Sequence, residues 1–148
     1  MKRQTILFIA ALFSILSFLG SHAHAADSRN LVVAVNKIRA AHGLQGLSLS
    51  PRMQKAAQQQ AVLMASKRKM SHSVGWGNSF SKRLRRVGHR GAAAENIARG
   101  QKSVSHVLRS WMKSPGHRRN MLNPSMRTFG LSVAKGGGRN YWAMVLGG

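Results

Sequence analysis

The hydrophobic periodicity of this chain changes along its length, and that change limits the folds the chain can form. Over residues 104–112 apolar side chains recur at intervals of three and four, which predicts an amphipathic helix capped by Ser103. From Phe129 the period is two. Residues 129–133 alternate, glycines 136–138 supply a turn, and residues 140–146 are typical of a second strand. Two strands around a glycine turn predict a β-hairpin.

The segments before residue 104 are mainly helical in pattern. Helical spacing begins near Ser28 and stops at Gly43, and Ser50-Pro51 is a start signal for a helix that we expect to reach about Lys69. Residues 80–87 form a short amphipathic pattern, with Lys and Arg on the face opposite the apolar side chains. Helices followed by a hairpin predict an α+β fold with helices packed over a small antiparallel sheet, to which residues 95–98 add a third strand.

The N-terminal segment has the features of a secretory leader. A short positive stretch precedes an almost wholly apolar run over residues 6–19, and Ala23 and Ala25 are spaced like a signal-peptidase site. The alternative is a membrane anchor, but the run is shorter than the roughly 20 residues that span a bilayer. We therefore expect residues 1–25 to be a signal peptide, residues 26–148 to be the folded domain, and the protein to be secreted or periplasmic.

Charge and cysteine content narrow the functional classes. The chain has 24 Lys and Arg against 2 Asp and Glu, a formal charge of +22, and no cysteine. Such a charge attracts anionic polymers, lipid head groups and other polyanions, although it also favours solubility in an acidic or salty habitat. The absence of cysteine excludes a disulfide framework and a catalytic thiolate. No segment after the leader is apolar enough to span a membrane.

The scarcity of acids removes several enzyme classes. The only carboxylate side chains belong to Asp27, next to the expected leader, and Glu95. This scarcity argues against a glycosidase that uses two carboxylates. A serine hydrolase is also disfavoured, because no Gly-x-Ser-x-Gly elbow is present. The glycines at 136–138 lie in the expected hairpin turn and not in a phosphate-binding loop.

The remaining candidate for chemistry is the set of His72, Glu95 and His117. Two imidazoles and a carboxylate are able to hold a divalent metal ion with an open coordination position. Their sequence separation gives no local metal-binding spacing, so the pattern alone does not establish such a site. The alternative for Glu95 is an ion pair with Arg99 or another arginine that only stabilises the fold.

Three motifs resemble a known family. Met70-Ser71-His72, residues 95–100 (ENIARG) and residues 111–120 (WMKSPGHRRN) are similar, in order and spacing, to the motifs of the CAP superfamily. That family comprises cysteine-rich secretory proteins, antigen 5 and pathogenesis-related 1 proteins. This chain resembles the bacterial, disulfide-free branch, the SCP-like extracellular proteins, over about residues 31–146.

The resemblance implies an α-β-α sandwich with a central cleft lined by two histidines and two glutamates. The matching positions are His72, His117 and Glu95, and the resemblance implies that the two histidines hold zinc or another divalent cation. The second glutamate of the pattern follows the helical Trp111 by three positions, where this chain has Ser114. That departure removes a general base and weakens the case for hydrolysis.

Three functional hypotheses follow. The first is a secreted CAP-domain binding module with a metal-binding cleft and a basic surface for anionic envelope polymers, lipids or other polyanions. The second is a metal-dependent hydrolase in which Glu95 is the base between His72 and His117. The third is a polyanion-binding protein in which the cleft is vestigial and the arginine-rich helix with Arg83, Arg85 and Arg86 does the binding.

Overall fold

The computed structural model describes residues 29–148. The predicted signal peptide, residues 1–25, lies outside them. A helix runs over residues 29–40, and residues 34–148 form one compact unit, to which the following description applies. Among the described residues, no helix combines the length and apolar character needed to cross a membrane.

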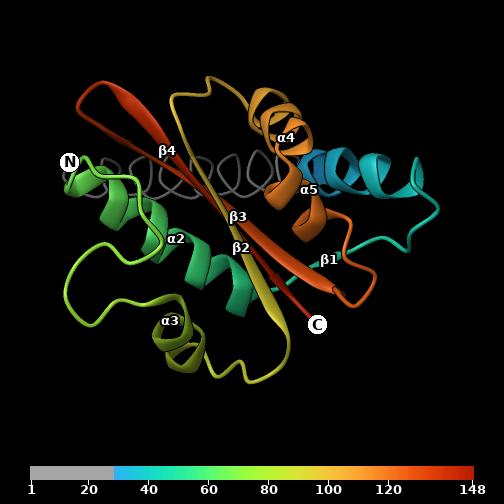
Figure 1. Ribbon diagram of the computed structural model, residues 1–148, viewed down its shortest axis with the longest axis horizontal. Coiled ribbons are helices and arrows are strands. Elements are labelled where there is room, and N and C mark those ends of the chain that lie inside the picture. The colour runs from blue at the N-terminus through green and yellow to red at the C-terminus, as the bar shows by residue number, and fades with distance from the viewer. Residues whose placement is uncertain (1–28) are drawn as a thin grey trace, which may run out of the picture. The chain divides into compact units, whose positions relative to one another are not determined.

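The centre of the unit is a sheet with the strand order β1-β3-β4-β2 (Figure 1). The predicted hairpin is confirmed, since β3 and β4 pair in antiparallel fashion and Gly137 and Gly138 turn the chain with φ of 54° and 74°. β2 pairs antiparallel with β4. The strands are β1 (Ser48–Leu49), β2 (Ala93–Arg99), β3 (Thr128–Gly136) and β4 (Arg139–Gly147).

The sheet differs from the predicted three antiparallel strands, because it has a fourth strand and is mixed. β1 pairs in parallel with β3, and it lies between Gly43 and Ser50, where the sequence pattern predicts no strand. The strand is only two residues long, so it has too few side chains to show an alternating pattern. Its pairing depends on Ser48 and Ser50, whose backbone N–H groups donate to the carbonyls of Arg127 and Phe129 at 3.0 and 2.9 Å.

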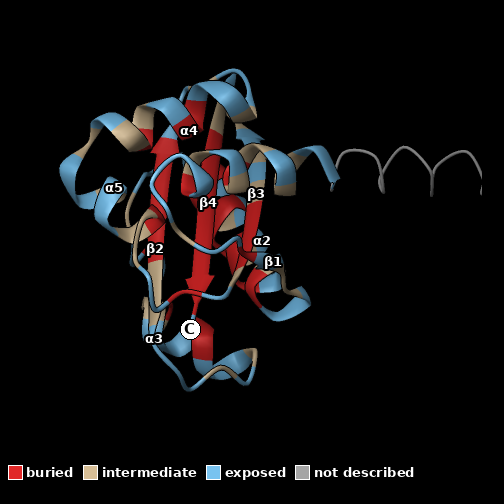
Figure 2. Cartoon of the chain, turned by 90° about the vertical axis from the view of Figure 1, so that its right-hand side faces the viewer, coloured by how far each residue is buried: buried red, intermediate tan, exposed pale blue. Residues whose placement is uncertain are grey.

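One face of the sheet is covered by α2 (Pro51–Ser66), which Ser50 caps as predicted. The helix ends before the predicted Lys69. It lies so close to β3 that a Cβ at Gly130 would come within 2.2 Å of the Gln54 nitrogen, and one at Gly136 within 2.1 Å of the Ala65 oxygen. Glycines on the strand and alanines on the helix therefore set the spacing of these layers. The buried residues of both layers form the core (Figure 2).

The opposite face is covered by α4 (Val104–Lys113) and α5 (Pro115–Met121), which gives an α-β-α arrangement (Figures 1 and 2). Ser103 caps α4 as predicted, and Trp111 is 1% exposed. The end of α5 is tied to the first helix by Arg39. This buried side chain donates to the carbonyls of Met121 and Asn123 at 2.7 and 3.1 Å.

The short helix α3 (Phe80–Arg86) contains the main error of the sequence prediction. Arg83 was expected on the solvated basic face, but its side chain is 0% exposed. Phe80, Arg83, Leu84 and Val87 follow the i, i+3, i+4, i+7 spacing of one helix face, so Arg83 belongs to the inner stripe. Lys82, Arg85 and Arg86 are exposed. An arginine at a core position requires a buried acceptor.

Candidate functional site

The site is built around the edge strand β2. This strand pairs only with β4, and its residues alternate between the two faces of the sheet. Glu95 points to the face covered by α2 and α3, where Ile97 also joins the core around α2. Asn96 points to the face covered by α4 and α5, where it contacts α5. Two neighbouring residues therefore organise two different environments.

Glu95 supplies the buried acceptor that Arg83 requires. Arg83 Nη2 donates to Glu95 Oε2 at 2.5 Å, and both side chains are essentially without solvent exposure. The other carboxylate oxygen, Oε1, lies 2.8 Å from His72 Nδ1. The ion pair weighed as the alternative for Glu95 is present, with Arg83 as the partner in place of Arg99, and the same carboxylate also contacts His72.

His72 is held at two points. Its Nδ1 donates to Glu95, because a carboxylate only accepts, and its backbone carbonyl accepts from Arg83 Nη1 at 3.0 Å. The same Arg83 nitrogen donates to the Asn78 carbonyl at 2.7 Å. The His72 side chain is 53% exposed, so the imidazole is fixed at one nitrogen while the ring remains accessible from solvent.

His117 is held in a different way, by neutral groups. Asn96 Nδ2 donates to the His117 carbonyl at 3.0 Å, and Asn120 Nδ2 donates to Asn96 Oδ1 at 2.8 Å. His117 Nδ1 lies 2.9 Å from Ser114 Oγ. Its ring is tilted by 48° against Trp111, with 6.4 Å between centroids. Ser114 therefore fixes His117 from the position at which the family resemblance predicts a glutamate.

The two imidazoles are near enough to influence each other. Burial lowers the pKa of His117, and the positive charge of His72 lowers it further. Since the ordinary value is 6.5, His117 is neutral at pH 7. Neutral imidazole is the form that binds metal ions. We call His72 and His117 the two-histidine site.

The structure places His72 against Glu95 and ties the backbone of His117 to the neighbouring Asn96, but it does not leave Glu95 free. Both carboxylate oxygens already have partners, so direct coordination by Glu95 is not part of this arrangement. Across residues 29–148 there is no group of three or more His, Cys, Asp or Glu side chains placed to hold a metal ion. Among the described residues, the two imidazoles are the side chains of this site that remain for a bound ligand.

Sequence reasoning missed the residues that position the site: Arg83, Asn96 and Asn120. The position of Arg83 on the same helix face as the apolar residues of α3 could have predicted that its side chain is buried. Asn96 and Asn120 gave no such signal, because a buried amide cannot be distinguished from an exposed one by pattern. The structure shows Asn96 as 0% exposed. Its hydrogen bonds join β2 to α5 across 21 and 24 residues of sequence.

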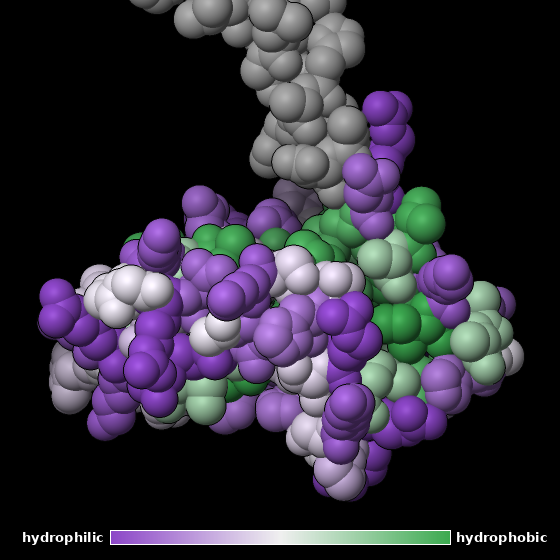
Figure 3. Space-filling view, turned by 90° about the horizontal axis from the view of Figure 1, so that it is seen from above, coloured by the Kyte–Doolittle hydropathy of each residue, from purple (hydrophilic) through white to green (hydrophobic). Residues whose placement is uncertain are grey.

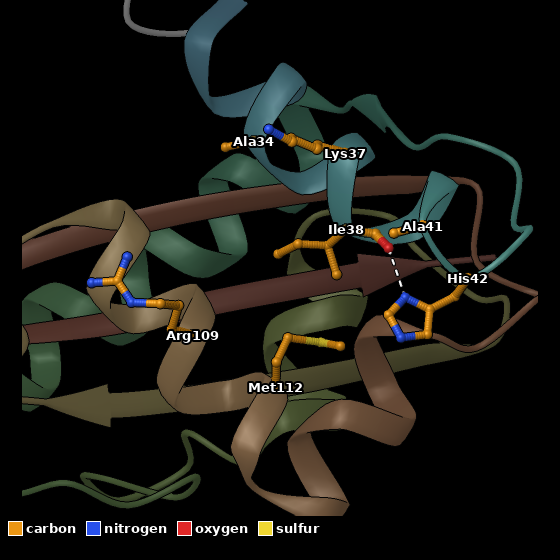
Figure 4. A pocket seen from close by; sticks show the side chains of 7 residues that line it. All are labelled: Ala34, Lys37, Ile38, Ala41, His42, Arg109 and Met112. Carbon is orange, nitrogen blue, oxygen red and sulfur yellow. Dashed lines mark hydrogen bonds between the residues drawn. The ribbon is translucent and has the colours of Figure 1, made fainter.

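A separate cavity of about 380 Å³ lies elsewhere, between residues 34–42 and α4. Figure 4 shows its mainly apolar wall, formed by residues that include Ala34, Ile38 and Met112, with Lys37 and Arg109 beside it. His42 Nδ1 donates to the Ile38 carbonyl at 2.8 Å, as drawn in Figure 4, and His42 Nε2 accepts from Arg118. None of the residues of the two-histidine site lines this cavity.

The surface charge has one sign. Asp27 lies outside the described residues and Glu95 is buried, so within residues 29–148 no acidic side chain is exposed. Nearly all the Lys and Arg of that region are exposed, with Arg39 and Arg83 as buried exceptions. Hydrophilic side chains cover much of the face in Figure 3, with hydrophobic ones gathered over part of it.

Comparison with known proteins settles the family. The model of the cysteine-rich secretory protein family, CAP, matches residues 32–146. This chain is a CAP-domain protein. The match includes both residues of the two-histidine site, and it confirms the family resemblance predicted from the three motifs.

Three bacterial proteins are among those to which this chain is similar. The uncharacterized protein YkwD of Bacillus subtilis is 32% identical over 113 residues, which are 76% of this chain and 44% of YkwD. An extracellular SCP-domain protein from Bacillus anthracis has a TM-score of 0.71 at 24% identity, covering 83% of this chain and 40% of that one. An outer surface protein from Borrelia burgdorferi has a TM-score of 0.74 at 19% identity, with 82% and 92% covered.

These similarities establish the family and the fold. This chain spans less than half the length of YkwD and of the B. anthracis protein. Activities that belong to those whole proteins are therefore not transferred by the match. The function of the CAP domain in this chain must be argued from its own site and surface.

Proposed function

We propose that this protein is a secreted binding module of the bacterial cell envelope. It binds a divalent metal ion, such as zinc, between His72 and His117, and it binds an anionic partner through its cationic surface. The observation that carries the metal proposal is that both Nδ1 atoms are engaged by protein oxygens, from Glu95 and Ser114. That arrangement leaves the Nε2 atom of each ring for a ligand.

The donor set fits a divalent metal ion. Metal-binding histidines usually donate one ring N–H to a carboxylate or another oxygen, which fixes the tautomer and the ring orientation. Glu95 and Ser114 supply these partners here. Two imidazoles leave coordination positions for water or for a ligand group, and a bound metal ion supplies Lewis acidity. A site with two protein ligands also predicts weaker binding than one with three.

Hydrolysis has less support than binding. A general base must be able to accept a proton from the reacting group. Glu95 is 1% exposed and both its oxygens already accept from Arg83 and His72. Ser114 replaces the second glutamate expected from the family pattern. The two-histidine site therefore has no free carboxylate among the described residues, and we assign it binding.

The metal proposal is tested by zinc titration in a calorimeter. We expect His72→Ala and His117→Ala each to weaken zinc binding strongly, and the double variant to abolish it. His106→Ala is the matched control, because His106 is an exposed histidine on α4 outside the site. Zinc binding by the double variant equal to that of the unaltered protein would overturn the assignment.

The anionic-partner proposal follows from the absence of exposed acidic side chains among residues 29–148. Binding of a polyanion to a cationic surface releases counterions from the polyanion. Added salt makes that release less favourable, so the affinity falls as the salt concentration rises. We expect the affinity for an anionic polymer or an anionic vesicle to fall steeply between low and physiological salt. An affinity that does not change with salt contradicts charge-driven binding.

Secretion is supported by the leader-like sequence and by the extracellular and outer-surface descriptions of two similar structures. We expect processing after Ala25. Intact-mass measurement of protein recovered from outside the cytoplasm tests this directly. A mass that retains residues 1–25 would indicate the alternative, an uncleaved anchor.

A further inference from the structure

The connection between α2 and α3 displays a tryptophan entirely to solvent. Trp76 is 102% exposed, whereas the other two tryptophans, Trp111 and Trp142, are 1% and 4% exposed. Transfer of a tryptophan side chain out of water is strongly favourable in free energy, because its ring is large and apolar. Single exposed apolar residues are common on protein surfaces, so the setting of Trp76 decides whether it has a role.

The turn that carries Trp76 is firmly built. Gly75 and Gly77 flank it with φ of 81° and 68°, values that favour glycine. Val74 and Asn78 on either side are 3% and 7% exposed, and Asn78 Nδ2 donates to the Val74 carbonyl at 3.0 Å. We call residues 74–78 the tryptophan loop. Its ends are anchored in the fold while its central indole projects outward.

Exposed cations lie in the helical segments that precede and follow the tryptophan loop in the chain. Arg86 Nη2 donates to the Gly77 carbonyl at 3.0 Å, and Lys82 lies one turn before Arg86 on the exposed face of α3. Before the loop, a Cβ at Gly75 would come within 3.4 Å of the Leu63 side chain of α2, and Lys67 follows Leu63 by four positions. All three cations are exposed. The loop with the exposed indole thus contacts one exposed cation, Arg86, and further exposed cations lie on the helical segments before and after it.

We infer that the tryptophan loop is the contact of this protein with an anionic phospholipid bilayer. Indole rings favour the region between lipid head groups and hydrocarbon, and nearby Lys and Arg gain free energy from the negative surface of an anionic leaflet. A soluble polyanion satisfies the cations but offers no apolar layer to the indole. A bilayer satisfies both. This inference rests on the anionic-partner part of the proposed function and does not depend on metal binding.

The test uses the intrinsic fluorescence of the purified protein with vesicles of phosphatidylglycerol and phosphatidylcholine. Since Trp111 and Trp142 are buried, a change in emission on binding reports on Trp76. We expect a blue shift with anionic vesicles, quenching by brominated acyl chains, and no binding to pure phosphatidylcholine at physiological salt. Trp76→Ser should weaken vesicle binding about tenfold and remove the shift.

Val133→Ser is the matched control, because Val133 is a 45% exposed apolar residue on β3, outside the loop. It should bind vesicles as the unaltered protein does. Unchanged affinity of Trp76→Ser for anionic vesicles overturns the inference, and the cationic surface then binds by charge alone. An equal blue shift with a soluble anionic polysaccharide or single-stranded DNA also overturns it, in favour of stacking. Failure to bind any anionic probe overturns the anionic-partner proposal itself.

Discussion

The two faces of β2 hold their histidines by different means. On one face, Glu95 fixes His72 through a buried charge that Arg83 balances. On the other face, Asn96 fixes the backbone of His117 through neutral amide hydrogen bonds. The two residues are adjacent in the chain and point in opposite directions. The comparison shows that one strand can position two histidines with independent supports.

Substitutions in the charged support are expected to lower the free energy of unfolding more than substitutions in the neutral support. A buried ion pair costs desolvation on both sides, so removing one partner leaves an uncompensated charge. An amide network lacks that penalty, because its groups are neutral and lose only hydrogen bonds. The charged face should therefore be the more sensitive to substitution. The following predictions test and refine this difference.

The largest effect is expected for Glu95→Gln. Arg83 would remain buried without a counter-charge, and the loss in free energy of unfolding should be about 3–5 kcal/mol. Urea unfolding monitored by circular dichroism measures it. The double variant Arg83→Met with Glu95→Gln is the control and should recover much of the loss. A loss below about 1 kcal/mol in the single variant would contradict a strong buried pair.

A smaller loss is expected for Asn96→Ala. The substitution removes the donor to the His117 carbonyl and the acceptor for Asn120, at a cost of about 1–3 kcal/mol. The same urea experiment gives the value. A loss greater than that of Glu95→Gln would reverse the comparison and make the neutral face the more sensitive one.

Ser114→Ala should affect the ligand site more than the fold. Loss of the oxygen partner of His117 Nδ1 is expected to weaken zinc binding by about 10- to 100-fold, with little change in stability. Calorimetric titration measures the affinity. Ser110→Ala is the matched control, because Ser110 Oγ bonds to the His106 carbonyl on α4 and not to the site. Equal zinc affinity of both variants would show that Ser114 does not position His117.

The smallest effect concerns the proton affinity of His117. Its pKa should lie below 6.5 in the folded protein, and His72→Ala should raise it partway, because burial is the larger cause and remains. NMR titration of the imidazole protons measures both values. A pKa at or above 6.5 in the unaltered protein would remove the electrostatic link between the two faces.

The same lowered pKa has a consequence for stability. As pH falls through 6.5, the unfolded chain takes up a proton at His117 before the folded protein does. Stability should therefore be fully present above that pH and decrease below it, until the folded pKa is passed. Urea unfolding at several pH values checks this, and His117→Asn should flatten the dependence in that window.

Much of the fold could be predicted from local pattern. Period and capping residues located α2, α4 and the β3-β4 hairpin, and Ser50 and Ser103 cap their helices as expected. The strand β1 could not be predicted, because two residues carry no period. The end of α2 was misjudged by a few residues, since helix-forming residues continue to Lys69 while Arg68 turns the chain with φ of 52°.

The candidate site could be predicted in part. Glu95 stood out because acids are so rare in this chain, His72 and His117 completed the candidate set, and the family motifs strengthened it. The partners Arg83 and Ser114 were not assigned positioning roles. Their roles depend on which side chain faces inward, and Arg83 looks like its exposed neighbours when only its charge is considered.

The sequence by itself determined the helices, the hairpin, the family and the sign of the surface charge, because period, caps, motifs and net charge are local or additive properties. Only the tertiary structure decided that Glu95 is shared between Arg83 and His72, and that Trp76 remains in solvent while the other tryptophans are buried. The physical reason is that burial and ion pairing depend on distant segments meeting in space.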